Sequence, residues 1–331
     1  MTGELLPLLA ATTLAFSLLA YILLDGTDLG VGIWLGLTRQ PADRHRVVLS
    51  ILPIWDANET WLVLLLGGML ALFPEAYSTF LSTMLVPVVV MLLALVLRGA
   101  AIEFRHGARS PGWCDAAVFI GSLLASLFQG ILFGCFIQGV PVPPAAPEAL
   151  LWCTPFTLFC GLVITVLYLV LGAGWLQWRM AGPFSEHFRR MMGWGGVGTL
   201  LLFMGLMIWL VHLNEHNRAR WQDGALIALF AAVLAMLVAL FYLTLARRYA
   251  LTALMLLLAA TGLGFLAIGL TLFPQVLPPQ LTLYNSASPP ASQGFVLAGF
   301  AMVIPFTLFY NTYVFWVFKG KIHRQTVRIK Y

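Results

Sequence analysis

Long apolar runs alternate with short polar connections along the whole chain. A run of about 20 apolar residues is long enough to cross a bilayer as an α-helix. Nine such runs predict transmembrane helices over 5–37, 50–73, 76–98, 115–138, 153–178, 191–212, 224–246, 250–273 and 293–318. Little sequence lies outside these runs, so the pattern predicts an all-α polytopic membrane protein without a sizeable soluble domain.

Composition supports this class. Of the 331 residues, 61% are hydrophobic and 9% are charged, and the mean hydropathy is +0.92. A soluble globular domain has roughly 45–50% apolar residues, so a soluble fold is excluded. The N-terminal residues show neither a basic segment nor a small-residue cleavage site, and we therefore expect the first apolar run to be retained.

The basic residues predict the orientation in the membrane. Of the 18 Lys and Arg residues, 16 lie at the connections after the first, third, fifth and seventh runs or in the C-terminal tail, and only Arg218 and Arg220 lie on the other side. By the positive-inside rule the N-terminus is outside and the C-terminus is cytoplasmic. The basic residues occur singly or in pairs, so no nucleic-acid partner is expected.

Two proline-rich connections suggest how the helices are grouped. One follows the fourth run, over 140–147, and the other follows the eighth, over 274–290. This spacing favours two four-helix bundles and a peripheral ninth helix. We expect a first bundle with a polar cytoplasmic cluster over 1–138, a second bundle over 139–273, and an external loop, ninth helix and basic tail over 274–331.

Carboxylates inside the apolar runs are the first candidates for function. A buried carboxylate costs several kcal/mol unless it is paired or protonated. The acids of the first run are spaced i, i+3, as are those of the second, so each pair shares one helix face. Six ionisable groups are expected to meet at similar depth near the cytoplasmic side: Asp25, Asp28, Asp56, Glu59, Arg98 and Glu103.

Two interpretations of this cluster remain open. In the first, Arg98 neutralises one or two carboxylates and the cluster only fixes helix packing, which the small-residue stripe of glycines 26, 30 and 32 would also serve. In the second, the acids exchange protons with the cytoplasm. Four carboxylates beside one arginine leave excess negative charge, so proton sharing is expected. Trp55 and Trp61 are interpreted as interfacial anchors and packing rings.

Other chemistries find less support. All six histidines lie in connections or at the ends of the predicted helices, so we do not expect a haem held wholly by this chain. His212 and His216 match the H-x-x-E-H pattern of zinc peptidases, but they lie in a short connection and are interpreted as a solvated helix end. Cys135 and Cys153 could pair near the external side; otherwise the four cysteines are packing residues.

Several motifs together resemble subunit II of the cytochrome bd-type quinol oxidases, including the cyanide-insensitive branch. The resemblance covers nearly the whole chain and is most distinctive in segments 24–32 and 55–62. Further matching segments are Gly67-Gly68, Leu72-Phe73-Pro74 with Tyr77, Arg98-Gly99 before Glu103-Phe104-Arg105, Phe133-Gly134, Gln138-Gly139-Val140-Pro141 and 283–288. The loops after the fourth and sixth runs are short, which favours the cyanide-insensitive branch.

The resemblance implies a role within a larger enzyme of the bacterial cytoplasmic (inner) membrane. A larger, homologous subunit I would carry two haems b and one haem d and would oxidise quinol and reduce oxygen to water. This chain would be a haem-free partner that supports subunit I and contributes to electrogenic proton uptake, and it would be inactive alone. Small single-helix subunits and membrane lipid are further candidate partners, and a structural quinone is a further candidate cofactor, without assigned residues.

Carried onto this sequence, the resemblance implies Asp28 and Asp56 as proton-uptake carboxylates. The supporting residues would be Asp25, Glu59, Arg98, Glu103, Trp55 and Asn58. Two alternatives remain: a proton- or ion-coupled transporter that uses the same carboxylates, and an assembly partner without a proton role. Transporters place such sites near the midplane on interrupted helices, whereas these acids lie toward one face.

Overall fold

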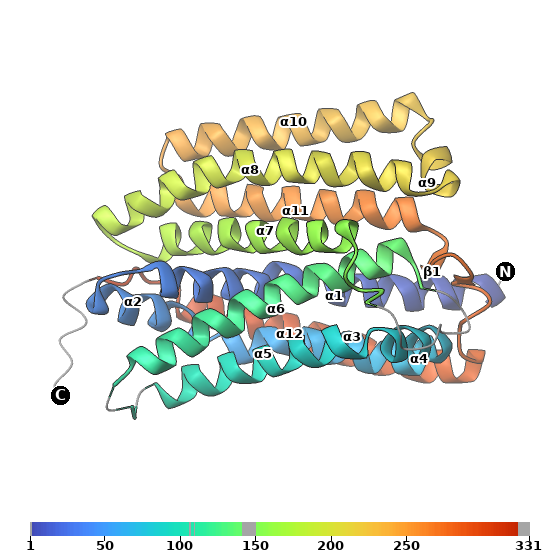
Figure 1. Ribbon diagram of the computed structural model, residues 1–331, viewed down its shortest axis with the longest axis horizontal. Helices are drawn as coiled ribbons and strands as arrows, with labels where there is room; N and C mark the ends of the chain where they lie inside the picture. The colour runs from blue at the N-terminus through green and yellow to red at the C-terminus, as the bar shows by residue number, and fades with distance from the viewer. Residues whose placement is uncertain (1, 106, 109, 141–149, 324–331) are drawn as a thin grey trace.

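The computed structural model describes residues 2–105, 107–108, 110–140 and 150–323, which form twelve α-helices and one short β-hairpin (Figure 1). His106, Arg109, the proline-rich stretch 141–147 and the tail from residue 324 lie outside this part. The helices are α1 (Thr2–Leu37), α2 (Pro41–Ile51), α3 (Trp55–Leu72), α4 (Pro74–Thr83), α5 (Leu85–Phe104), α6 (Gly112–Gln138), α7 (Pro155–Arg179), α8 (Pro183–Leu213), α9 (Glu215–Arg220), α10 (Gly224–Ala246), α11 (Ala250–Leu272) and α12 (Pro290–Val317).

Eight helices of the described chain are long and apolar enough to cross a membrane, and the bent pair α2 and α3 could form a ninth span. The prediction of an all-helical, multi-pass membrane protein is thereby confirmed. The hairpin of β1 (Gln275–Leu277) and β2 (Leu281–Thr282) lies in the loop before α12, where no strand was predicted.

Two of the predicted spans are wrong in their continuity. The helix predicted over 50–73 is interrupted between α2 and α3, whose axes differ by 49°. Pro53 lies in this break and has no backbone N–H with which to continue a helix. The helix predicted over 76–98 is divided at Met84 into α4 and α5, and α5 continues to Phe104. Pro87 cannot donate to the carbonyl of Thr83, so the first turn of α5 is not bonded to α4 there.

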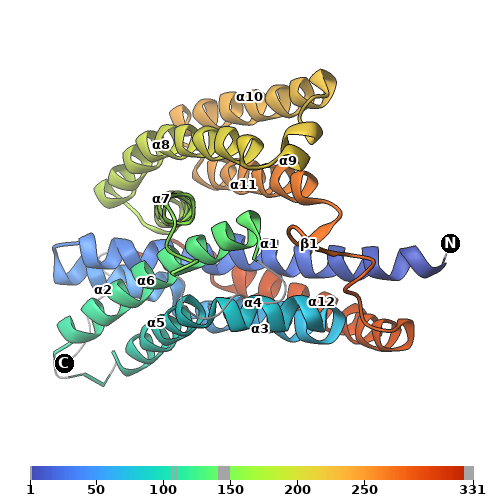
Figure 2. The same ribbon diagram turned by 45° about the vertical axis from the view of Figure 1, so that its right-hand side comes forward.

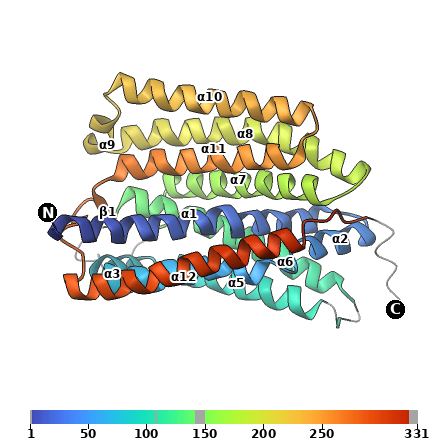
Figure 3. The ribbon, with the colours of Figure 1, turned by 180° about the vertical axis from the view of Figure 1, so that it is seen from behind.

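α1 is the central helix and packs against α3, α6, α7 and α12. Helices α8, α10 and α11 lie beyond α7, whereas α3 and α5 lie on the other side of α1 (Figures 1 and 2). Seen from behind, α12 runs along α1 and α3 (Figure 3). Because α7 contacts both α1 and α6, helices of the two expected bundles touch, and the boundaries at residues 138 and 273 stay a prediction.

The close contact of α1 with α7 depends on Gly30. A Cβ atom at this position would lie 1.8 Å from the carbonyl oxygen of Tyr168 and 3.0 Å from the nitrogen of Gly172. Only a residue without a side chain permits backbones to approach so closely, as at other small-residue contacts between membrane helices. The glycine stripe in the first apolar run therefore positions α7 against the acids of α1.

The antiparallel run of the helices gathers the basic residues at one end of the molecule, which we call the basic end (Figure 1). Its described members are Arg39, Arg44, Arg46, Arg105, Arg179, Arg189, Arg190, Arg247, Arg248, Lys319 and Lys321. Arg218 and Arg220 lie at the opposite end, in α9. At the basic end, the buried Arg46 of α2 donates to the carbonyl of Ile322 at 2.9 Å, and this contact fixes α2 to the segment after α12.

Candidate functional site

Arg98 is the centre of a polar cluster between α1, α3 and α5. The side chain is completely buried, and its Nη2 donates to Asp25 Oδ1 at 2.7 Å and to Glu59. Asp25 is also completely buried, whereas the Glu59 side chain is 27% exposed. The arginine therefore joins a carboxylate in the protein interior to one that reaches the surface.

Asp28 lies one turn further along α1 and is completely buried. Its Oδ2 accepts a hydrogen bond of 2.7 Å from Asn58 Nδ2 on α3. None of the described cations forms a direct ion pair with Asp28. With Asp25, Asp28 and Glu59 beside a single guanidinium, the cluster would be net negative if all three acids were ionised.

The structure separates two predicted members from this cluster. Asp56 and Glu103 are both exposed, although we expected all six ionisable groups to meet. Helical geometry explains the difference, since each residue advances about 100° around the axis. Asp56 lies about 200° from the buried Asn58, and Glu103 about 140° from Arg98, so each lies on another face of its helix.

The two tryptophans have different surroundings. Trp55 is half-buried with its ring against Gly99 of α5, where a Cβ atom would lie 2.9 Å from the ring. Trp61 is completely buried and makes an edge contact with Phe16, with ring centroids 5.7 Å apart. Trp61 is therefore a packing ring inside the molecule.

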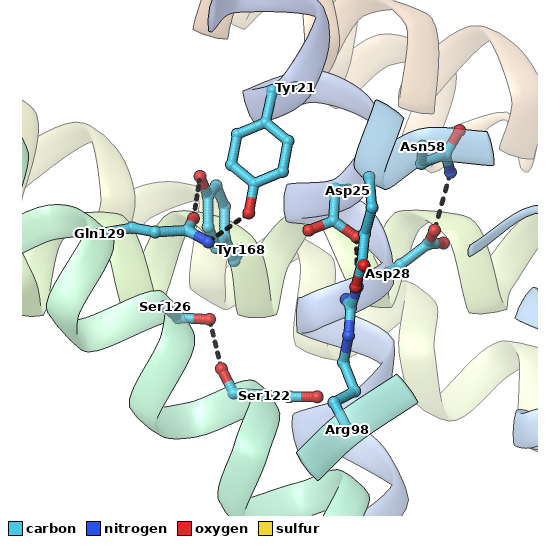
Figure 4. A network of polar contacts seen from close by, with 10 residues as sticks. Tyr21, Asp25, Asp28, Asn58, Arg98, Ser122, Ser126, Gln129 and Tyr168 are labelled. Atoms are coloured by element: carbon cyan, nitrogen blue, oxygen red, sulfur yellow. Dashed lines mark hydrogen bonds and ion pairs between the residues drawn. The ribbon is translucent and has the colours of Figure 1, made fainter. Parts of the chain in front are cut away.

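Three polar residues that the sequence analysis did not identify, Tyr21, Gln129 and Tyr168, extend the cluster toward the N-terminal end of α1, and Figure 4 shows them beside Asp25. Gln129 on α6 donates from Nε2 to the Tyr21 hydroxyl at 2.5 Å, and the Tyr168 hydroxyl on α7 donates to Gln129 Oε1 at 3.0 Å. Tyr21 precedes Asp25 by one helical turn, and an amide within an apolar run was the available signal. A tyrosine one turn from a buried acid and an amide inside an apolar run each indicate a buried polar contact.

Gly26 makes room for this extension. A Cβ atom at Gly26 would lie 2.3 Å from the Tyr168 ring, which therefore packs directly on the backbone of α1. The glycine beside Asp25 thus has a definite role: it lets the phenol of α7 reach the polar layer. Ser122 and Ser126 line the same face of α6, and Ser126 Oγ donates to the Ser122 carbonyl at 2.7 Å (Figure 4).

Several buried polar atoms in the cluster have no hydrogen-bond partner among the residues that the structure describes. They are Asp25 Oδ2, Asp28 Oδ1, Asn58 Oδ1, Arg98 Nε, Arg98 Nη1 and Ser122 Oγ. Buried polar groups are nearly always hydrogen-bonded, to protein or to ordered water. Such a concentration of unpaired donors and acceptors marks a place suited to water molecules.

The described part of the chain offers no set of side chains that matches a metal-ion or haem site. No group of three or more His, Cys, Asp and Glu residues there could hold a metal ion. His212 is in the last turn of α8 and His216 is in α9, so the helix that H-x-x-E-H zinc binding requires is interrupted at Asn214. All four cysteines are described and are free thiols, so Cys135 and Cys153 are not paired.

Comparison with known proteins decides the family. The family described as "Cytochrome bd terminal oxidase subunit II" matches residues 6–318. The chain belongs to this family. The expectation drawn from segments 24–32 and 55–62 is thereby confirmed, and the transporter alternative falls away.

Individual relatives of this subunit II chain agree. It is 25% identical to "Cytochrome bd-I ubiquinol oxidase subunit 2" of Escherichia coli K12, in a match that covers 94% of this chain and 93% of that one. It is 28% identical to "Probable cytochrome oxidase subunit 2" of Haemophilus influenzae, where the match covers 58% of this chain and 54% of that protein.

A solved structure has the same fold. The subunit II chain is similar to a chain of bd oxidase from Geobacillus thermodenitrificans, with a TM-score of 0.81. The sequence identity is 19%, and the match covers 95% of this chain and 98% of that one. The helical arrangement around α1 is therefore shared with a bd oxidase.

Proposed function

We propose that this chain supports a haem-bearing subunit I in a quinol-oxidising, oxygen-reducing enzyme of the bacterial inner membrane and carries protons from the cytoplasm toward it. One observation carries the proton role: Asp28 is completely buried and pairs directly with none of the described cations, yet it belongs to a cluster that reaches the surface at Glu59. The relative named as a ubiquinol oxidase subunit supports ubiquinol as the electron donor.

The haems belong to the partner in this proposal. Haem iron between membrane helices is usually held by histidine. The described histidines of this chain lie in α2, at the two ends of α8, in α9 and beyond α12, and do not offer a facing pair. The described histidines therefore do not fit a haem, and the proposal gives two haems b and one haem d to subunit I.

An apolar cavity between α7, α8, α10 and α11 would accommodate a structural quinone. Its lining is almost entirely aliphatic and aromatic and includes Leu167, Phe203, Phe241 and Leu257. An isoprenoid tail would replace lipid contacts there. No oxidation step is assigned to it.

The proposed path begins at the basic end. Asp56 is exposed in the first turn of α3 and precedes Glu59 by one turn of the same helix. Glu59 shares Arg98 with Asp25, and Asp28 follows on the same helix. The unpaired polar atoms around these residues are partners for water, so protons can move between the carboxyl groups by way of hydrogen-bonded water.

The direction of uptake follows from the charge distribution. The basic end carries eleven of the thirteen described Lys and Arg residues outside the buried Arg98. The positive-inside rule places this end in the cytoplasm. Protons would then enter this chain from the cytoplasm.

Replacing Asp28 with Asn tests the proposal. The variant Asp28→Asn keeps the shape and removes the exchangeable proton, so oxygen consumption by the purified complex should fall roughly tenfold or more. The haem absorption spectrum should be unchanged, because the partner still assembles. Glu75→Gln, at an exposed acid of α4, is the matched control.

Unchanged oxygen consumption in Asp28→Asn would show that the buried carboxyl is not on the path. Loss of the haem bands would show that the cluster stabilises the assembly and has no proton role.

A further inference from the structure

The chain of Tyr21, Gln129 and Tyr168 has a fixed direction. The Tyr168 hydroxyl donates to the amide oxygen of Gln129, and the amide nitrogen donates to the Tyr21 oxygen. A phenol has a single O–H, and the oxygen of Tyr21 is already engaged as an acceptor. The proton of Tyr21 is therefore available to a further acceptor.

The candidate acceptor is Asp25. The Tyr21 hydroxyl faces the Asp25 carboxyl in Figure 4. Asp25 Oδ1 accepts from Arg98, whereas no described residue donates a hydrogen bond to Oδ2. A buried carboxylate oxygen without a donor is costly, so donation of the Tyr21 proton to Oδ2 would satisfy both groups.

We propose that Tyr21, held by Gln129 and Tyr168, is a positioning residue that keeps Asp25 ionised, so that the exchangeable proton of the cluster resides on Asp28. This assignment rests on the proton role proposed above. The two acids, which the sequence places on one helix face, then have different roles. Asp25 is the fixed anion that holds Arg98, and Asp28 is the carboxyl that takes up and releases the proton.

The hydrogen-bond donors around the two acids support the division. Asp25 accepts from the guanidinium of Arg98 and faces the phenol of Tyr21, and bonds to the charged form stabilise the carboxylate. Asp28 has only the neutral amide of Asn58, and its other oxygen is unpaired.

Infrared spectroscopy of the purified oxidase complex can locate the proton, because only a protonated carboxyl has the C=O stretch of a carboxylic acid. We expect such a band, perturbed between the oxidised and reduced enzyme, to be lost in Asp28→Asn. In Tyr21→Phe this band should weaken and a second band should appear. The second band should be absent from the double variant Tyr21→Phe/Asp25→Asn.

The pH dependence of oxygen consumption provides a second readout that a purely structural role would not move. Without the Tyr21 donor, Asp25 takes up a proton more readily, and Asp28 then loses an anionic neighbour and releases its proton more easily. The alkaline limb in Tyr21→Phe should therefore shift to lower pH by about one unit. Gln129→Leu, which frees the Tyr21 oxygen, should shift it in the same direction by less.

Tyr249→Phe is the control, because Tyr249 lies exposed between α10 and α11, outside the cluster and the apolar cavity. It should leave both readouts unchanged. A wild-type spectrum and profile in Tyr21→Phe, or a carboxylic-acid band that is lost in Asp25→Asn and kept in Asp28→Asn, would overturn the assignment. Full oxygen consumption in Asp28→Asn would instead contradict the proposed function and leave the infrared assignment standing.

Discussion

Arg98 is the residue on which the electrostatics of the site depend. It is completely buried, and it is the only described cation in contact with Asp25 and Glu59. A buried ion pair adds little net stability by itself, but removing one partner leaves an uncompensated charge in a medium of low dielectric constant. The residue is thus required by the acids around it.

We expect Arg98→Leu to destabilise the complex by about 3–5 kcal/mol, because Asp25 loses its cation inside the protein. Thermal unfolding in detergent, followed through the haem absorption, measures the change. Arg218→Leu is the control, since the Arg218 and Glu215 side chains are 48% and 86% exposed and such a pair contributes less than about 1 kcal/mol. Equal losses in the two variants would contradict a buried ion-pair role for Arg98.

At the scale of elements, the contact between α1 and α7 positions the cluster. Gly30 brings the backbones together, and Gly26 admits the Tyr168 ring beside Asp25. Most of the helices could be predicted from apolar runs because their length reflects the bilayer. The breaks around Pro53 and before Pro87 were missed because hydrophobicity averaged over a run does not register the loss of one backbone donor.

The site could be predicted only in part for a related reason. The i, i+3 spacing correctly groups Asp25 with Asp28, but the depth of a residue does not reveal which face of its helix is buried. Asp56 and Glu103 lie on the exposed faces of their helices, which the spacing of the acids along the chain did not indicate. Gln129 and Tyr168 come from helices distant in sequence, and only the packing of α6 and α7 on α1 brings them to Tyr21.

Gly30→Ala tests the α1–α7 contact. A methyl group there would overlap the Tyr168 carbonyl oxygen, and we expect a loss of about 3 kcal/mol in unfolding free energy, measured by denaturant unfolding of the complex. Gly67→Ala on α3 is the matched control, because a Cβ atom there meets nothing within 4 Å. It should be neutral or stabilise the helix by up to about 1 kcal/mol. Tolerance of alanine at Gly30 would show that the helices are further apart.

For the whole molecule, the distribution of charge predicts which end faces the cytoplasm. Cys153 is exposed at the end opposite the basic end, whereas Gly320 lies at the basic end after α12. In intact cells stripped of their outer membrane, a membrane-impermeant maleimide should label Cys153. It should label Gly320→Cys, made in a Cys153→Ser background, only after the cells are permeabilised. The reverse pattern would contradict the proposed direction of uptake.

Proton uptake itself is the most direct test of the account, which holds that Asp28 loads protons for oxygen chemistry in the partner subunit. The measurement is the absorbance of a pH indicator during a single turnover of the reduced complex with oxygen. In Asp28→Asn we predict proton uptake slowed roughly tenfold or more with intact haem bands, while Glu75→Gln matches the wild type. Uptake at the wild-type rate in Asp28→Asn would show that Asp28 does not load these protons.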